Sequence, residues 1–326
     1  MNALIDGFGR RITYARLSVT DRCDLRCRYC MPEKMRFLPR QDLLSLGELE
    51  RLADGLIARG VTRLRLTGGE PLVRRGVMDL ARALGSRIGD GLDELTLTTN
   101  GTQLEHHADA LVAAGVRRVN VSLDTLDRDM FAALTRRDAL PAVLRGIAAA
   151  RGAGLTVKIN TVALAGVNEH ALPDMVAWAH GEGHSLSLIE VMPMGEVEAA
   201  RTDQFLPLTA VREALEQRFT LVPCAYRTGG PARYYEVPET GGRIGLISPL
   251  TQNFCASCNR IRITATGQLY ACLGGREQVD LRAALRGGSL DAALDLAMAI
   301  KPERHMFEEM FAADTAVERH MSATGG

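Results

Sequence analysis

The 326-residue sequence predicts an α/β protein: an incomplete (β/α)6 TIM-type barrel followed by a small β-rich lobe. Short β-branched runs alternate with helix-like segments at intervals of about 30 residues, which is typical of parallel βα units. Polar motifs follow these runs, as functional groups do at the carboxyl ends of barrel strands. Only six βα units are visible, so we expect the barrel to be incomplete.

The elements follow from periodicity, taken in chain order. The predicted strands are Ile12–Val19, Thr62–Thr67, Glu94–Thr99, Arg118–Leu123, Leu155–Val162 and Ser185–Val191. Amphipathic segments lie between them at Leu46–Ala58, Val77–Ile88, Leu104–Ala114, Pro141–Gly152 and His170–Gly181. Glycines suited to helix C-termini follow four of these: Gly60, Gly115, Gly154 and Gly183. An open doubly wound sheet is the alternative, but the polar motifs favour the barrel and no Rossmann fingerprint is present.

The composition changes after about residue 205, which predicts two domains, 1–205 and 206–326. Short alternating segments then predict a β-rich lobe, at Arg233–Val237, Arg243–Ile247, Arg260–Ala265 and Gln268–Ala271. Two late helical segments lie near Leu281–Leu285 and Leu290–Ile300.

Charge and hydropathy exclude several classes of partner. The 39 basic and 39 acidic side chains balance, so no net field favours nucleic acid or an anionic membrane. No apolar run approaches the ~20 residues of a membrane span, and the N-terminus lacks a signal-peptide core. We therefore expect a cytoplasmic protein. In that reducing compartment, closely spaced cysteines are more often metal-binding or catalytic than disulfide-bonded.

Three of the seven cysteines, Cys23, Cys27 and Cys30, have the spacing C-x3-C-x2-C. The pattern arises by chance roughly 0.003 times in such a chain. A structural zinc site closes four ligands around the metal, and simple 4Fe-4S carriers also use four cysteines. Three thiolates on a cubane leave one iron open, so this set predicts a 4Fe-4S cluster that binds a substrate or cofactor.

A second set comprises Cys255, Cys258 and Cys272. We favour a second iron–sulfur cluster here. The alternative is a zinc knuckle that pins a hairpin, with Cys224 or a histidine as the fourth ligand.

Cations on predicted strands suggest a ligand with a phosphate chain. Arg260 and Arg262 follow the second cysteine pair and project from one face of a predicted strand. The alternative is a solvated basic strand. Both guanidinium groups lie beside a candidate metal site, however, and their planar shape suits bidentate binding of phosphate oxygens. Arg16, Arg65 and Lys158 lie on strands with apolar alternation and are further candidates.

The segment Thr67–Pro71 contains Gly68 and Gly69 directly after a strand, followed by Glu70. Paired glycines let the backbone approach a ligand closely, and the adjacent carboxylate can accept a hydrogen bond from an ammonium group. Its place beside the cysteine loop favours a binding role over an ordinary turn. A methionine such as Met192 is ordinarily a core residue, but its position directly after a strand makes it a candidate binding residue.

Together these motifs resemble the radical S-adenosylmethionine superfamily and, more closely, the GTP 3′,8-cyclase family of molybdenum cofactor biosynthesis. The motifs that carry the resemblance are Arg16–Cys23, Cys23–Pro32, Leu64–Pro71, Thr98–Gly101, Asn120–Asp124, Lys158–Val162, Gly166–Asn168, Phe254–Arg262, Cys272–Leu273 and Gly325–Gly326. The first cysteine motif identifies only the superfamily, whereas the second set with its Asn-Arg-x-Arg sequence and the Gly-Gly end identify the family.

The resemblance implies a radical reaction on GTP. The first cluster binds S-adenosylmethionine through its open iron and cleaves it to methionine and a 5′-deoxyadenosyl radical. That radical takes the 3′ hydrogen of GTP, and the sugar radical attacks carbon 8 of guanine to give (8S)-3′,8-cyclo-7,8-dihydro-GTP. A second 4Fe-4S cluster holds the guanine base through its own open iron.

Residue roles are implied in the same way. Metal ligands are Cys23, Cys27, Cys30, Cys255, Cys258 and Cys272. Cofactor contacts fall at Tyr29, Gly69, Ser122 and Met192, and GTP contacts at Arg16, Arg65, Thr98, Lys158, Arg260 and Arg262. Catalytic roles fall to Cys23, Cys27, Cys30, Arg260, Arg262, Gly325 and Gly326.

Implied partners are GTP, an electron donor such as flavodoxin or ferredoxin, and cyclic pyranopterin monophosphate synthase, which receives the product. The protein is expected to be a monomer or homodimer. The Gly-Gly tail is predicted to enter the barrel beside the substrate, because two residues without a Cβ atom thread where larger ones do not fit.

Two positions depart from the family pattern. Ser187 stands where relatives often have an arginine, and Arg201 or Arg227 is a candidate to supply the missing charge. Thr324 replaces a large apolar residue near the C-terminus. Two other functions stay open: a radical enzyme of another subfamily that modifies peptides, and a non-catalytic, metal-stabilised binding protein.

Overall fold

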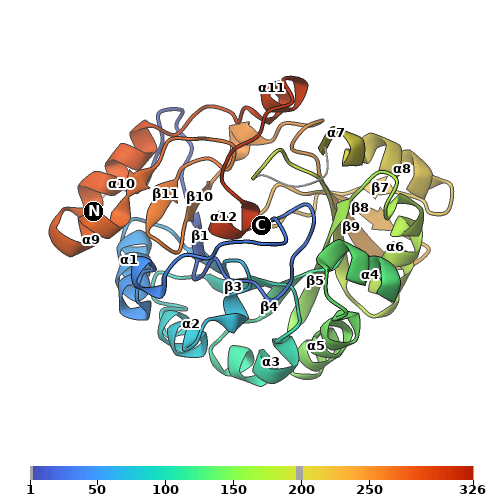
Figure 1. Ribbon diagram of the computed structural model, residues 1–326, viewed down its shortest axis with the longest axis horizontal. Coiled ribbons are helices and arrows are strands. Elements are labelled where there is room, and N and C mark those ends of the chain that lie inside the picture. The colour runs from blue at the N-terminus through green and yellow to red at the C-terminus, as the bar shows by residue number, and fades with distance from the viewer. Residues whose placement is uncertain (1–2, 196–200, 326) are drawn as a thin grey trace.

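The computed structural model describes residues 3–195 and 201–325, except for the side chains of 201 and 202. Their strands form one sheet in the order β12-β11-β10-β1-β2-β3-β4-β5-β6-β9-β8-β7. The sheet curves around a central space, and helices cover its outer face (Figure 1). Among the described residues, no helix is long and apolar enough to cross a bilayer.

The middle of the sheet confirms the six predicted βα strands. They are β1 (Tyr14–Ser18), β2 (Arg63–Thr67), β3 (Glu94–Thr99), β4 (Arg118–Ser122), β5 (Thr156–Ala163) and β6 (Ser185–Glu190), and neighbours pair in parallel. The helices of this region are α1 (Leu46–Ala58), α2 (Val77–Gly85), α3 (Leu104–Ala113), α4 (Arg128–Thr135), α5 (Leu140–Gly152) and α6 (Leu172–Gly181). Each predicted helix lies within a few residues of its observed position, whereas α4 was not predicted.

The C-terminal strands extend this sheet at both edges and do not form a sheet of their own. They are β7 (Val222–Pro223), β8 (Arg233–Val237), β9 (Gly242–Ile247), β10 (Arg260–Ile263), β11 (Gln268–Tyr270) and β12 (Val279–Asp280). Strand β9 pairs in parallel with β6, and β10 pairs in parallel with β1. The second cysteine set therefore lies beside the strand that precedes the first set.

The remaining helices are α7 (Arg201–Gln204), α8 (Leu208–Glu216), α9 (Leu281–Gly287), α10 (Leu290–Ala299), α11 (Phe307–Ala312) and α12 (Met321–Thr324). The C-terminal helix α12 lies in the central space of the curved sheet, apart from the outer ring (Figure 1).

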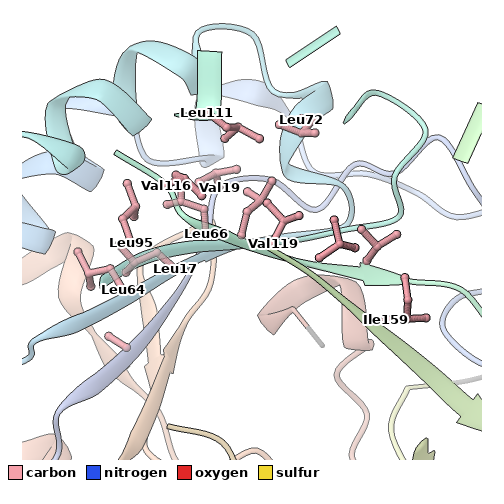
Figure 2. Close-up of a cluster of buried hydrophobic side chains, with 14 of the residues drawn as sticks. Leu17, Val19, Leu64, Leu66, Leu72, Leu95, Leu111, Val116, Val119 and Ile159 are labelled. Carbon is pink, nitrogen blue, oxygen red and sulfur yellow. The ribbon is translucent and has the colours of Figure 1, made fainter. Parts of the chain in front are cut away.

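The hydrophobic core fills the space between the sheet and the outer helices. Leu17, Leu64, Leu66, Leu95 and Val119 are at most 1% exposed and face this layer (Figure 2). Burial of each such side chain contributes about 1.5–3 kcal/mol relative to exposure. Because side chains alternate along a strand, the residues between them point into the barrel. The polar residues that alternate with these core residues along each strand are therefore the ones that reach the barrel interior.

Candidate active site

Two neighbouring cavities occupy the barrel interior and share part of their walls. The first has an empty volume of about 1150 Å³ and is lined by Cys23, Cys27 and Cys30. The second has an empty volume of about 1090 Å³ and is lined by Cys255, Cys258 and Cys272. Residues common to both are Asn160, Ile189 and Met192. A molecule in one cavity therefore lies next to a molecule in the other.

The first cysteine loop follows β1 and is held by side chains from the β3 end of the barrel. Asp24 accepts hydrogen bonds from Asn100 Nδ2 at 2.7 Å and from Thr102 Oγ1 at 2.6 Å. Burial, with a smaller contribution from the Glu70 carboxylate, raises the pKa of Cys23 to about 12. Burial also raises the pKa of Cys30, to about 11. In the absence of a bound metal, these thiols therefore keep their protons near neutral pH.

The donor set fits an iron–sulfur cluster. Three buried thiols line one cavity, and metal binding is what deprotonates thiols of raised pKa. Within the part of the chain that the structure describes, no three His, Cys, Asp or Glu side chains group tightly enough to hold a single metal ion. A four-iron cluster is larger than one ion and needs ligands spread around it.

The environment of Glu70 differs from the sequence-based expectation that its carboxylate binds an ammonium group of a ligand. Its carboxylate is fully buried and accepts hydrogen bonds from Thr99 Oγ1 at 2.8 Å, Leu72 N at 3.0 Å and Asn100 N at 2.6 Å. These donors occupy most of its acceptor positions, and Glu70 is not among the residues that line the first cavity, so a bound ammonium group does not reach it. Glu70 therefore joins the loops after β2 and β3, and its role is to position them.

Gly69 does line the first cavity, and the reason for a glycine is steric. A Cβ atom at Gly69 would collide with the backbone carbonyl of Arg22, in the cysteine loop. Close approach of these two loops thus requires a residue without a side chain.

The other expected cofactor contacts, Tyr29, Ser122 and Met192, also line the first cavity. The Tyr29 hydroxyl donates to Asp124 Oδ2 at 2.6 Å, and Asp124 Oδ1 accepts from Val162 N at 2.8 Å. Burial raises the pKa of Asp124 to about 6. Sequence reasoning missed Asp124 and Asn160 as cavity residues, although both lay within motifs that it singled out.

The second cavity is lined by the five predicted cations Arg16, Arg65, Lys158, Arg260 and Arg262. In the register of adjacent strands, Arg16 of β1 lies beside Arg262 of β10 and Arg65 of β2. Glu94 also lines this cavity, but Arg118 already binds it at 2.7 Å. The predicted GTP contact Thr98 lies apart, on the first cavity, and its hydroxyl is 3.4 Å from Arg65 Nη1.

Burial and mutual repulsion destabilise these charges. Burial, followed by the nearby Arg260, lowers the pKa of Arg262 to about 10. Burial, followed by Arg65 and Arg118, lowers the pKa of Lys158 to about 7. The Lys158 ammonium donates to the Tyr234 hydroxyl at 2.6 Å. A polyanion in the cavity would relieve this repulsion, which makes the cavity suited to a phosphate chain.

The second cysteine set has a different electrostatic environment from the first. Arg260 Nη2 lies 3.9 Å and Lys301 Nζ 3.8 Å from Cys258 Sγ. Burial alone raises the pKa of Cys258, but Arg260 and Lys301 outweigh it and lower that pKa to about 7. The three thiols and these cations fit a thiolate-bound cluster as well. Sequence reasoning missed Lys301, which follows an apolar helix and lacks a motif of its own.

Arg227 does not replace the arginine expected at position 187. Its Nη1 atom donates to the backbone carbonyls of Cys224 and Tyr226, and it does not line the second cavity. The side chain of Arg201, the other candidate, lies outside the described residues. In the part of the chain that the structure describes, Cys224 lines neither cavity.

The C-terminal tail enters the barrel. Thr324 is fully buried, and Met321 and Ser322 line the first cavity. Gly325 has a φ of 71°, and a Cβ atom there would collide with Thr67 of β2. Gly326 lies outside the described residues.

The barrel with a three-cysteine loop after its first strand defines a radical S-adenosylmethionine protein, and residues 17–179 match the model of the Radical SAM superfamily. Residues 184–307 match the model described as Molybdenum Cofactor Synthesis C. The chain is 66% identical to the GTP 3′,8-cyclase of Erythrobacter litoralis, over 99% of this chain and 98% of the relative. It is 59% identical to that of Rhizobium meliloti, over 99% and 94%. The chain belongs to the GTP 3′,8-cyclase family.

Solved structures share the fold at low identity. Streptococcus suis SuiB bound to precursor peptide SuiA matches with a TM-score of 0.65 and 16% identity, over 89% of this chain and 66% of that one. Native anSMEcpe with bound AdoMet matches with a TM-score of 0.62 and 14% identity, over 91% and 83%.

Proposed function

We propose that this protein converts GTP to (8S)-3′,8-cyclo-7,8-dihydro-GTP, the first step of molybdenum cofactor biosynthesis. The observation that carries the proposal is the shared wall between a thiol-lined cavity and a cation-lined one. Radical transfer between two bound molecules needs their reacting atoms to be neighbours. The family membership and the two matching family models support the same reaction.

In the first cavity, Cys23, Cys27 and Cys30 hold a 4Fe-4S cluster, and Tyr29, Gly69, Ser122 and Met192 contact S-adenosylmethionine. When bound, these groups supply the 5′-deoxyadenosyl radical that takes the 3′ hydrogen of GTP, so that the sugar carbon joins carbon 8 of guanine. Asp124 orients the Tyr29 ring through the 2.6 Å hydrogen bond. Glu70 holds the two loops that form the cavity wall.

In the second cavity, the cations bind the triphosphate and the cysteines hold a second 4Fe-4S cluster beside the base. Charge-assisted contacts from Arg16, Arg65, Lys158, Arg260 and Arg262 compensate the phosphate charges. Thr98, which lies between Arg65 and the first cavity, suits a contact to the ribose rather than to the phosphates.

The barrel interior and the tail exclude water from the sugar. A carbon radical reacts only within its own molecule when competing donors are kept out. The buried Thr324 and Gly325 close the barrel beside Thr67, which lines the first cavity. The tail, Gly325 together with Gly326, thereby assists the first radical step.

The proposal extends to the wider reaction. Residues 1–205 form the catalytic barrel, and 206–326 supply the lobe with the second cluster and the tail. A low-potential donor such as flavodoxin or ferredoxin provides two electrons per turnover, one for the cleavage of S-adenosylmethionine and one that, with a proton, reduces the cyclised nucleotide radical. Cyclic pyranopterin monophosphate synthase receives the product in the reducing cytoplasm.

Anaerobic reconstitution and turnover test the proposal. The protein should bind about eight irons per chain, as two cubanes require, and should convert GTP to the cyclised nucleotide with S-adenosylmethionine and dithionite. About four irons would contradict the second cluster. Zinc without iron would contradict the radical reaction and favour a metal-stabilised binding protein.

A further inference from the structure

His305 lies between α10 and α11 at the end of the second cavity that holds the cysteines. Its side chain lines the cavity and is 5% exposed. The ring packs against Phe254 and Phe307, with centroid separations of 5.9 and 4.8 Å. Its backbone N–H donates to Cys255 Sγ at 3.4 Å. These contacts hold the imidazole in one orientation beside the second cysteine set.

The two ring nitrogens are not equivalent. The backbone N–H of Phe307 donates to Nδ1 at 3.5 Å, so Nδ1 is an acceptor and the neutral ring carries its proton on Nε2. The Nε2 atom is buried and has no hydrogen-bond partner among the residues that the structure describes. Buried donors are rarely left unpaired. The unpaired donor indicates a ligand in the cavity that supplies the acceptor.

The walls of the cavity indicate which part of a nucleotide this ligand presents. Near His305 the cavity is lined by Phe254, Phe307 and Leu273, with the Arg260 guanidinium 5.3 Å from the Phe254 ring, whereas Lys158 comes from β5, farther along the sheet. Aromatic walls and a neutral N–H donor suit a flat heterocycle with a carbonyl acceptor. Guanidinium and ammonium groups suit phosphates.

We propose that His305 donates a hydrogen bond from Nε2 to the carbonyl oxygen of the purine base and so contributes to base selection. The inference rests on the proposed function, because it assumes that the base of GTP occupies the cysteine end of the second cavity. The competing roles are an iron ligand through Nε2 and a purely structural ring.

The variant His305→Phe keeps an aromatic ring between Phe254 and Phe307 but removes the donor, and His305→Gln keeps an N–H donor of similar reach. Both are compared with the parent after anaerobic reconstitution, by iron content and by equilibrium dialysis with GTP and with inorganic tripolyphosphate. Phe should weaken GTP binding about tenfold, as expected for an unpaired polar partner. Gln should stay within about threefold of the parent. Iron content and tripolyphosphate binding should not change.

Three results would overturn the inference. Equal GTP affinity in His305→Phe and the parent would show that Nε2 donates to nothing on the base. Loss of about half the iron would make His305 part of the cluster site. Equal weakening of GTP and tripolyphosphate would indicate a collapsed cavity. Failure of the proposed function looks different: the parent itself would bind GTP no more tightly than tripolyphosphate and would not cyclise it.

Discussion

The ammonium group of Lys301 lies 3.8 Å from Cys258 Sγ and joins the two segments that carry the second cysteine set. It donates to the carbonyl of Arg260 at 3.1 Å and to the carbonyl of Ala271, the residue before Cys272. Lys301 is only 3% exposed, so these hydrogen bonds form away from bulk water. One buried side chain therefore places a cation beside a thiol and fixes the spacing of the cysteines.

Replacing Lys301 with Met should destabilise the protein and its second metal site. The substitution leaves two buried carbonyls without their donor, which costs about 1–3 kcal/mol. Differential scanning fluorimetry and iron analysis measure the effect, and the exposed Lys34→Met serves as the matched control. Parental melting temperature and iron content in Lys301→Met would show that the ammonium group is dispensable.

The two cysteine sets should have separable roles. Cys30→Ala should abolish cleavage of S-adenosylmethionine, because the first set holds the cluster that cleaves it. Cys272→Ala should leave some uncoupled cleavage while cyclisation of GTP is lost. Quantification of 5′-deoxyadenosine and cyclised nucleotide separates these effects. Complete loss of cleavage in both variants would make the second set purely structural.

Local sequence patterns predicted most of the fold. Strand β3 and helix α1 match their predicted limits because periodicity over a few residues defines them. The pairing of Tyr14 with Arg260 joins segments that lie about three quarters of the chain length apart, and no local pattern encodes it. This pairing places β10, β11 and β12 at one edge of the barrel sheet, and the pairing of β9 with β6 places β9, β8 and β7 at the other.

The site was predictable where a motif carries the chemistry. The six cysteines and five cations belong to motifs, and the structure gathers them on two adjoining cavities. Lys301 and His305 escape such reasoning because only tertiary packing brings them to Cys258 and Cys255. Glu70 was misinterpreted for the converse reason: its partners, Thr99 and Asn100, come from another loop.

GTP affinity should fall as the pH rises above neutrality. Burial and the neighbouring Arg65 and Arg118 lower the pKa of Lys158 to about 7, so the free protein loses this charge above that pH. The protonated form attracts phosphate, and affinity should decrease by at most about tenfold per pH unit. Titration between about pH 7.5 and about pH 9, where the terminal phosphate is fully ionised, measures it.

The control for that titration is Lys158→Arg, whose guanidinium keeps its charge over this range. Its affinity should vary much less with pH. An equally steep decline in the variant would assign the pH dependence to another group.

Deletion of Gly325 and Gly326 should impair catalysis but not folding. Gly325 is buried beside Thr67, yet it lies outside the hydrophobic core between sheet and helices. Iron content and melting temperature should be unchanged, whereas GTP-dependent deoxyadenosine formation should fall at least about tenfold, or about 1.4 kcal/mol of transition-state stabilisation. Gly325→Ala should show a similar loss because its Cβ atom has no room. A parental rate in the deletion variant would make the tail a dispensable end.

Transfer of isotope from GTP tests the central claim most directly. The reconstituted protein is incubated anaerobically with 3′-deuterated GTP, S-adenosylmethionine and dithionite, and the products are analysed by mass spectrometry. The adjoining cavities predict one deuterium in 5′-deoxyadenosine and an equal amount of cyclised nucleotide that lacks it. Deoxyadenosine without deuterium, or cleavage of S-adenosylmethionine with GTP unchanged, would contradict the claim that GTP is the substrate.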